Sequence, residues 1–193
     1  MNRWRRTLLL TMLLAGVLLI YFAIEKKGRS ANGGETSTPP SLSELGVTME
    51  IPEGMTVNRR GKDFVWLSDN GSGIMRNICI YSYPATRLDT AVVVNKRDSV
   101  MSRNIQGEEP QMHMKTDQQR EITQQCNDDG TLHTSGWWEM EGDMMGGPFV
   151  CHSRYDARKR RVIVAEAFLY APDRDKEVPL QRLEEVLTTL KTE

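Results

Sequence analysis

Hydrophobic positions form one long run near the N-terminus and a series of short segments after it. The run from Thr7 to Ile24 contains no charged residue. As a helix it would rise roughly 27 Å, close to the thickness of a bilayer's hydrocarbon core. Arginines come before the run, at positions 3, 5 and 6, and this favours a cytoplasmic N-terminus. We therefore predict a single-pass membrane anchor over residues 1–27, with the remaining chain outside the cytoplasm.

A cleaved secretory signal is the alternative interpretation of the same segment. The apolar run is longer than the hydrophobic core of a usual signal peptide, and no pair of small residues follows it at cleavage spacing. Residues 14–16 resemble a lipoprotein cleavage box, yet Val17 stands where the lipidated cysteine would be. These features favour an uncleaved anchor. Residues 28–43 are rich in Gly, Ser, Thr and Pro, which predicts a flexible linker to a globular domain over 44–193.

The globular part shows alternating apolar segments separated by turn-forming residues, the pattern of antiparallel strands. Strands are predicted over residues 47–51, 64–67, 74–83, 132–141, 149–155 and 162–171, and in a short segment around Ile122. Two segments have helical spacing instead. One covers about Thr90–Arg103, with Val93, Val94, Arg97, Val100 and Met101 on one side, and the other opens near Pro179 and carries a stripe of leucines.

The segment 162–171 decides the expected fold class. Apolar residues occupy both of its faces, interrupted by Glu166, so both sides of the sheet should be covered. We therefore predict an α+β domain in which a mostly antiparallel sheet carries helices on both faces, an α/β/α sandwich.

The C-terminal third carries a family resemblance. The stretches WWEMEGDMMGGPFVCHSRYD, RVIVAEAFLYAPDRDK and LQRLEEVLTTLK, with IYSYP and KRDSVMSRNIQG before them, resemble a domain-of-unknown-function family of envelope proteins and lipoproteins from Bacteroidetes-type bacteria. The order of elements is also similar to PsbP-like sandwiches, an analogy of fold that assigns no activity. The resemblance implies a location in the cell envelope, here the periplasmic side of the inner membrane, and no reaction.

The net charge and the spacing of reactive residues argue against several classes of function. Outside the first 29 residues the chain has 19 basic and 25 acidic residues, so it lacks the positive field that nucleic-acid binding requires. The three cysteines and three histidines form no C-x-x-C pair and no familiar ligand spacing, so neither a metal nor a cofactor is predicted. No motif of a known hydrolase or nucleotide-binding site occurs.

Glu166 is the most informative single residue, because it interrupts an apolar face and a buried carboxylate must be paired or have a raised pKa. Simple hairpins with turns at 142–147 and 156–161 would place Trp138 opposite Cys151, and Cys151 opposite Glu166. A bond to Arg154, or a position at the sheet margin, is favoured over an open cleft. Cys151 and His152 are adjacent on a strand and so point to opposite faces.

The segment 142–148 is predicted to be a hairpin loop. Its glycines would supply positive φ angles, and the alternative is a loop that contacts a ligand or partner. The candidate binding residues are Asp143, Met145, Gly146, Gly147 and Pro148, together with Trp138 and Glu166.

Two functional hypotheses follow from these patterns. The first is a membrane-tethered, non-catalytic binding or accessory module that works with an envelope protein or ligand. The second is an envelope hydrolase that uses Glu166 or a Cys–His pair. The accessibility of Glu166 discriminates between them, since a catalytic carboxylate must line an open cleft.

Overall fold

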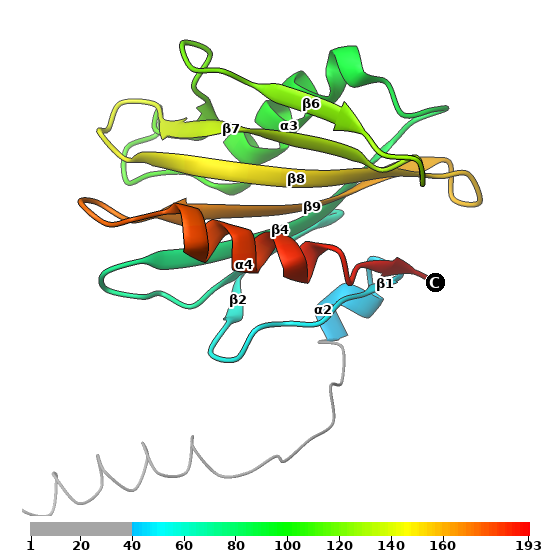
Figure 1. The fold of residues 1–193 in the computed structure, drawn as a ribbon, viewed down its shortest axis with the longest axis horizontal. Helices are drawn as coiled ribbons and strands as arrows, with labels where there is room; N and C mark the ends of the chain where they lie inside the picture. Colours follow the sequence, from blue (N-terminus) through cyan, green and yellow to red (C-terminus); the bar gives the residue numbers. More distant parts are fainter. Residues whose placement is uncertain (1–39) are drawn as a thin grey trace, which may run out of the picture. The chain divides into compact units, whose positions relative to one another are not determined.

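An eight-stranded antiparallel sheet is the centre of the computed structural model, which describes residues 40–193 (Figure 1). The strand order across this sheet is β2-β3-β4-β9-β8-β7-β5, and β6 pairs with another part of β7. The strands β1 and β10 form a separate two-stranded sheet that joins the first and last described segments of the domain.

The elements follow the chain in a simple order. They are α2 (Pro40–Ser43), β1 (Val47–Thr48), β2 (Thr56–Gly61), β3 (Phe64–Ser68), β4 (Met75–Pro84), α3 (Thr90–Asn104), β5 (Met114–Thr116), β6 (Thr123–Cys126), β7 (Leu132–Met140), β8 (Gly146–Asp156), β9 (Arg161–Tyr170), α4 (Glu177–Leu187) and β10 (Lys191–Thr192).

Alternation along β9 divides the core into two clusters, one on each face of the sheet. Ile163, Ala165, Ala167 and Leu169 face the helix α4, whose Leu183 and Leu187 are buried against them. Val162, Val164 and Phe168 face the opposite way and pack in one cluster with Val100 and Met101 of α3. Figure 1 shows α4 crossing in front of β9 and β4. The prediction that both faces of this strand are covered is confirmed.

The predicted α/β/α sandwich, however, is wrong. Strands make up 42% of the structure and helices 18%, so the domain is mostly antiparallel β. The sheet curls into a half-barrel. Among residues 40–193, α3 and α4 are the helices longer than one turn, so each face carries a single helix of that length. The apolar residues on both faces of segment 162–171 indicated that both faces are buried. They could not distinguish a layer of several helices from one helix packed on a curled sheet.

The strand β2 was missed because it lacks any apolar alternation. All six of its residues are exposed, and it pairs only with β3, at the edge of the sheet. Arg59 and Arg60 in this strand fit the charged character of edge strands, which discourages pairing with other chains.

The predicted anchor over residues 1–27 lies outside the described residues, as does the predicted linker up to residue 39. No helix within residues 40–193 is long and apolar enough to span a bilayer. The last predicted linker residues, Pro40–Ser43, form α2, and Leu42 is fully buried there.

The segment predicted as a loop over 142–148 is a turn only in its first four residues. The turn ends before Gly146, and Gly146, Gly147 and Pro148 belong to β8. Gly142 alone of these glycines has a positive φ, 80°. Gly146 and Gly147 are needed for close packing instead: a Cβ atom on Gly147 would overlap the Leu169 carbonyl oxygen, and one on Gly146 would lie 2.8 Å from the Trp138 carbonyl oxygen.

Pro148 fits this inner strand because of where the ladders end. The pairing of β8 with β9 starts only at Phe149, so the ladder with β9 requires no backbone N–H from Pro148. On the other side Pro148 is paired in register with Trp137, whose carbonyl accepts a bond from the Asp117 amide and thus points away from β8. Proline was therefore misleading evidence for a loop.

The packing at Gly147 gives a direct test. Gly147→Ala should lower the free energy of unfolding by about 1–3 kcal/mol, the usual range for forced overpacking. Gly73→Ala is the matched control, because a Cβ there has no atom within 4 Å, and it should stay within about 0.5 kcal/mol of wild type. Urea unfolding of both variants measures the difference, and equal stabilities would refute the close approach of Gly147 to β9.

Candidate functional site

Glu166 is fully buried on the α3 face of β9, and its partner is Arg97 of α3. The guanidinium Nη2 lies 2.7 Å from Oε1, and Nε lies 3.1 Å from both carboxylate oxygens. Both side chains are at most 1% exposed. Three charge-assisted contacts in a fork geometry make this one of the stronger kinds of side-chain bond.

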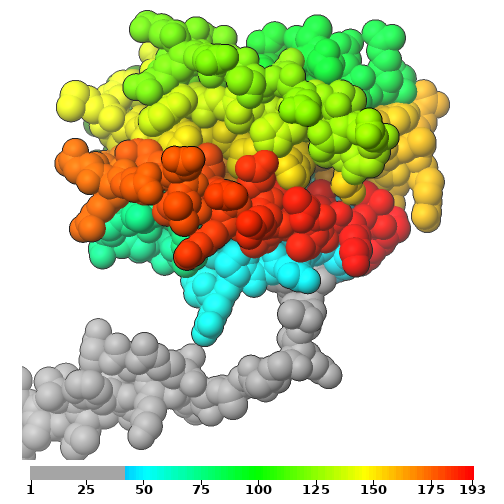
Figure 2. Space-filling view, in the orientation of Figure 1, coloured from blue at the N-terminus to red at the C-terminus, as the bar shows by residue number. Residues whose placement is uncertain are grey.

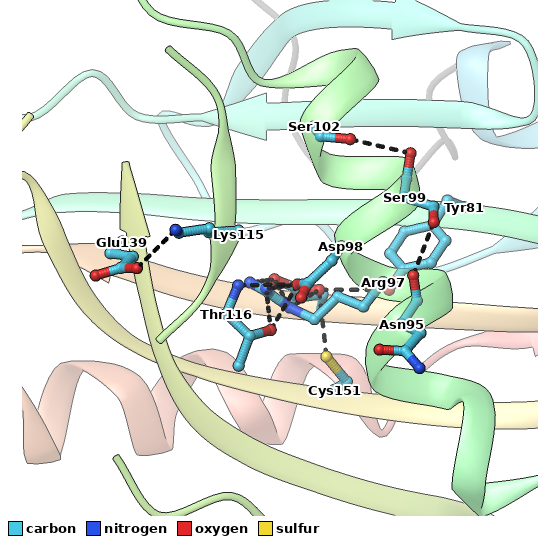
Figure 3. Close-up of polar contacts among 11 residues, drawn as sticks. Tyr81, Asn95, Arg97, Asp98, Ser99, Ser102, Lys115, Thr116, Glu139 and Cys151 are labelled. Atoms are coloured by element: carbon cyan, nitrogen blue, oxygen red, sulfur yellow. Dashed lines mark hydrogen bonds and ion pairs between the residues drawn. The ribbon is translucent and has the colours of Figure 1, made fainter. Parts of the chain in front are cut away.

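A second carboxylate completes the bonding of Arg97 (Figure 3). Nη1 lies 3.2 Å from Oδ1 of Asp98 and donates to Oγ1 of Thr116 at 2.9 Å. The same Asp98 oxygen accepts the amide and hydroxyl of Thr116, at 2.9 and 2.6 Å. Arg97 therefore links α3 both to the central strand β9 and to the short edge strand β5.

The remaining neighbours of the pair seal it from solvent. The Tyr81 hydroxyl and the Cys151 thiol donate to Oε2 of Glu166 at 3.4 and 3.2 Å, and the Arg97 guanidinium stacks on the Phe149 ring at 3.8 Å. A carboxylate enclosed in this way cannot reach a substrate. The arrangement therefore supports the packing of α3 and offers no catalytic acid.

The titration behaviour of these groups follows from their enclosure. Burial raises the pKa of Glu166 above its ordinary value, and the Arg97 guanidinium opposes this rise without cancelling it. Burial raises the pKa of the Cys151 thiol even more strongly, and the Glu166 charge adds to that rise. Cys151 is thus a thiol at neutral pH and lacks the thiolate that a nucleophilic cysteine needs.

The predicted partner of Glu166, Arg154, is wrong. Arg154 pairs in register with Ile163, so its side chain leaves the opposite face of the sheet, where it bonds Thr131 and Asp129. The sequence did indicate that Arg97 needs a buried partner, because this charged residue lies on the apolar side of the predicted helix 90–103. Only the packing of α3 on this face could join the two charges.

The Cys–His pair of the hydrolase hypothesis is also excluded by register. His133 pairs with His152, and both leave the face opposite to Cys151. Cys151 pairs with Glu166, as predicted. Trp138, however, lies opposite Gly147 and not opposite Cys151, because the turn is shorter than assumed. It still shares the α3 face with Cys151 and Glu166.

The predicted binding residues do not form one site. Asp143 is exposed in the turn beside Met144, which is 100% exposed, and Met145 packs against the cluster on the α3 face. Trp138 is buried there and donates its indole N–H to the Leu169 carbonyl at 3.0 Å. Pro148, another member of the predicted set, lines a surface hollow.

That hollow, of about 480 Å³, lies beside α4 at the β6–β7 edge of the sheet. It is lined by Arg120, Glu121, Thr123, Ser135, Gly136, Trp137, Pro148, Phe149 and Leu180. Arg120 stacks on the Trp137 ring at 4.1 Å and forms an ion pair with Asp117 at 3.2 Å. The Thr123 and Ser135 hydroxyls bond each other at 2.7 Å. Figure 2 shows the face that α4 crosses, with the β6–β7 segment next to it.

A polar cluster lies further along the same face. His133 of β7 and His152 of β8 have ring centroids 5.4 Å apart, and Glu184 of α4 reaches both of them. Its Oε1 is 2.8 Å from Nε2 of His133 and 3.7 Å from Nε2 of His152. Burial lowers the pKa of His152, and the neighbouring His133 lowers it further. Sequence spacing did not reveal this cluster, because its members are 19 and 32 residues apart and meet only through register and helix packing.

The buried ion pair generates a pH-dependent prediction. Arg97→Met leaves Glu166 buried without its cation, which should cost about 3–5 kcal/mol of unfolding free energy at neutral pH. Without the guanidinium, burial raises the pKa of Glu166 further, so the folded state binds the proton more tightly than the unfolded chain. The variant should therefore be most stable below the ordinary Glu pKa and lose stability as pH rises through the raised one.

The measurement is urea unfolding of this variant between about pH 4 and pH 8. Arg103→Met serves as the control, since Arg103 is an exposed residue of the same helix, and it should behave like wild type. A pH profile for Arg97→Met parallel to wild type would contradict the assigned role of Glu166.

Comparison with known proteins adds one finding. The family model of DUF4837, a domain of unknown function, matches residues 37–189, and the search of curated proteins gave no match. The predicted resemblance to a family of unknown function is confirmed at this level, whereas the envelope and lipoprotein association remains a prediction. Because the match covers most of the sequence, the chain belongs to the DUF4837 family.

Proposed function

We propose that this protein is a membrane-anchored, non-catalytic binding module of the cell envelope, with the hollow beside α4 as its ligand site. The main support for a ligand site is the hollow itself. Its volume, about 480 Å³, lies within the usual range of ligand sites, which combine apolar walls with a few placed polar groups.

The chemistry of the lining supports an amphipathic ligand. Trp137, Pro148 and Leu180 supply apolar surface, and the Thr123–Ser135 hydroxyl pair supplies both donors and acceptors. Arg120 stacks on the indole of Trp137 and is itself held by Asp117. An aromatic side chain held in this way loses little conformational freedom on binding, which favours affinity.

The hydrolase hypothesis loses both of its proposed catalytic groups. Glu166 is sealed beneath α3, and Cys151 cannot pair with His133, because their side chains leave opposite faces of the sheet. A binding role requires neither group.

The location in the envelope rests on the sequence. The uncharged run from Thr7 to Ile24, with arginines before it, supports an inner-membrane anchor with the domain in the periplasm. The acidic balance of the remaining chain argues against nucleic acid as a partner. The partner is therefore expected to be an envelope component.

Site-specific photocrosslinking in intact cells tests the proposal. A photoreactive residue at Glu121, on the rim of the hollow, should yield a defined adduct in the membrane fraction, identified by mass spectrometry. Adding Trp137→Ala should reduce the yield about tenfold or more, because truncating an aromatic anchor typically costs about 2 kcal/mol of binding free energy.

The control position is Asn95, an exposed residue of α3 on the opposite face. Melting curves verify that Trp137→Ala is folded. Equal adducts from positions 95 and 121, or an adduct at 121 that survives Trp137→Ala in a folded protein, would refute the hollow as the ligand site.

A further inference from the structure

Three metal-ligating side chains converge on the α4 face within residues 40–193. They are His133, His152 and Glu184, and one ligand atom from each lies within 4.8 Å of the others. They come from three elements, β7, β8 and α4, so the fold itself brings them together. Neither the family match nor the hollow assigns a role to this group.

The ligand types suit a divalent transition metal. Two imidazoles and one carboxylate are a donor set that zinc uses in sites that keep a fourth position open. The Glu184 oxygen already lies between the two ring nitrogens.

The supporting scaffold is well suited to hold such a site. His133 and His152 face each other across the β7–β8 ladder, so their backbone positions are fixed by the sheet. Glu184 follows Leu183, which is buried against the sheet together with Leu187. This packing fixes the turn of α4 that carries the carboxylate.

The side chains are reachable from solvent but are not fully exposed. The exposed fractions of His133, His152 and Glu184 are 25%, 13% and 37%, so an ion can enter without local unfolding. The positive charge of Arg154 acts on His152 and would repel a metal ion, but Arg154 forms an ion pair with Asp129 at 2.9 Å.

We propose that His133, His152 and Glu184 form a binding site for one divalent transition metal, with zinc as the best-suited ion. Zinc–ligand bonds of about 2.0–2.1 Å in a tetrahedral arrangement place ligand atoms roughly 3.3 Å apart. His133 and Glu184 already meet this spacing within about half an ångström. Nε2 of His152 lies 3.7 Å from the same Glu184 oxygen, which also agrees with this spacing within about half an ångström.

This metal site is independent of the ligand hollow, although the two are neighbours. Ser135, on the rim of the hollow, lies two residues beyond His133 on the same face of β7, and Leu180 lies one helical turn before Glu184. Loss of zinc binding would leave a ligand site at Trp137 intact, and the reverse also holds.

Calorimetric titration of zinc chloride into the full-length protein in detergent, after removal of metals with a chelator, tests the proposal. Wild type should bind one equivalent. Glu184→Gln and His152→Ala should each weaken binding by at least about tenfold, since even substitution of a residue that only orients a metal ligand costs that much. Binding should also weaken as the pH is lowered, because protons compete with zinc for the ligand atoms.

Matched controls separate this site from adventitious binding. Glu185→Gln alters the exposed neighbouring acid, and His113→Ala alters the histidine outside the cluster; both should bind zinc like wild type. Cobalt added in place of zinc should give visible absorption bands that Glu184→Gln abolishes. Absence of stoichiometric binding to wild type, or equal affinity in Glu184→Gln and Glu185→Gln, would overturn the proposal.

Discussion

The ion pair between Arg97 and Glu166 is the constraint on which the arrangement of this domain depends. Both charges are removed from water, and a buried charge is tolerated only when it is paired and hydrogen-bonded. Arg97 meets this condition only if α3 lies over β9 with β5 close by, because its partners come from those strands and from Asp98 beside it. Hydrophobic contacts are not directional and would allow several positions of α3 on the sheet. The hydrogen bonds of the Arg97 guanidinium are directional and fix one position of the helix.

The two faces of the sheet differ in how completely they are covered. The ion pair belongs to the closed face, and the hollows lie on the other. The α3 face is closed by aromatic and sulphur-containing side chains around the pair. The α4 face carries a helix of eleven residues on a wider sheet, and one helix cannot cover that width. A hollow remains at the β6–β7 edge, and a second one of about 350 Å³ lies on the other side of α4, lined by Pro52, Ile74, Arg76, Pro179, Arg182, Leu183 and Val186. Binding chemistry is therefore expected beside α4.

The sequence predicted elements well where periodicity was strong. The helix 90–103, the leucine stripe after Pro179 and the strand 162–171 agree with α3, α4 and β9 to within a few residues. Periodicity could not reveal β2, which is exposed throughout and has no apolar alternation, or the strand character of Gly146–Pro148, where glycine and proline normally mark loops. Those three residues are explained by tertiary contacts: backbone carbonyls pack against Gly146 and Gly147, and the ladder with β9 ends beside Pro148.

The candidate sites were predictable only in part. Glu166 was correctly recognised as a residue that needed a partner, and its pairing with Cys151 was correctly predicted from a hairpin turn at 156–161. Its true partner required knowledge of how α3 packs. The cluster of His133, His152 and Glu184 depends on the register of β7 and β8, and assuming too long a turn after Met140 moved every cross-strand partner by four positions.

A double-mutant cycle on Arg97 and Glu166 tests the central claim most directly. The unfolding free energies of Arg97→Met, Glu166→Gln and the double variant would be measured in urea at neutral pH. If the pair positions α3, adding Glu166→Gln to Arg97→Met removes the unpaired buried anion, so the double variant should be more stable than Arg97→Met, with a coupling of about 1–3 kcal/mol. Additive losses, or a double variant no more stable than Arg97→Met, would contradict the account.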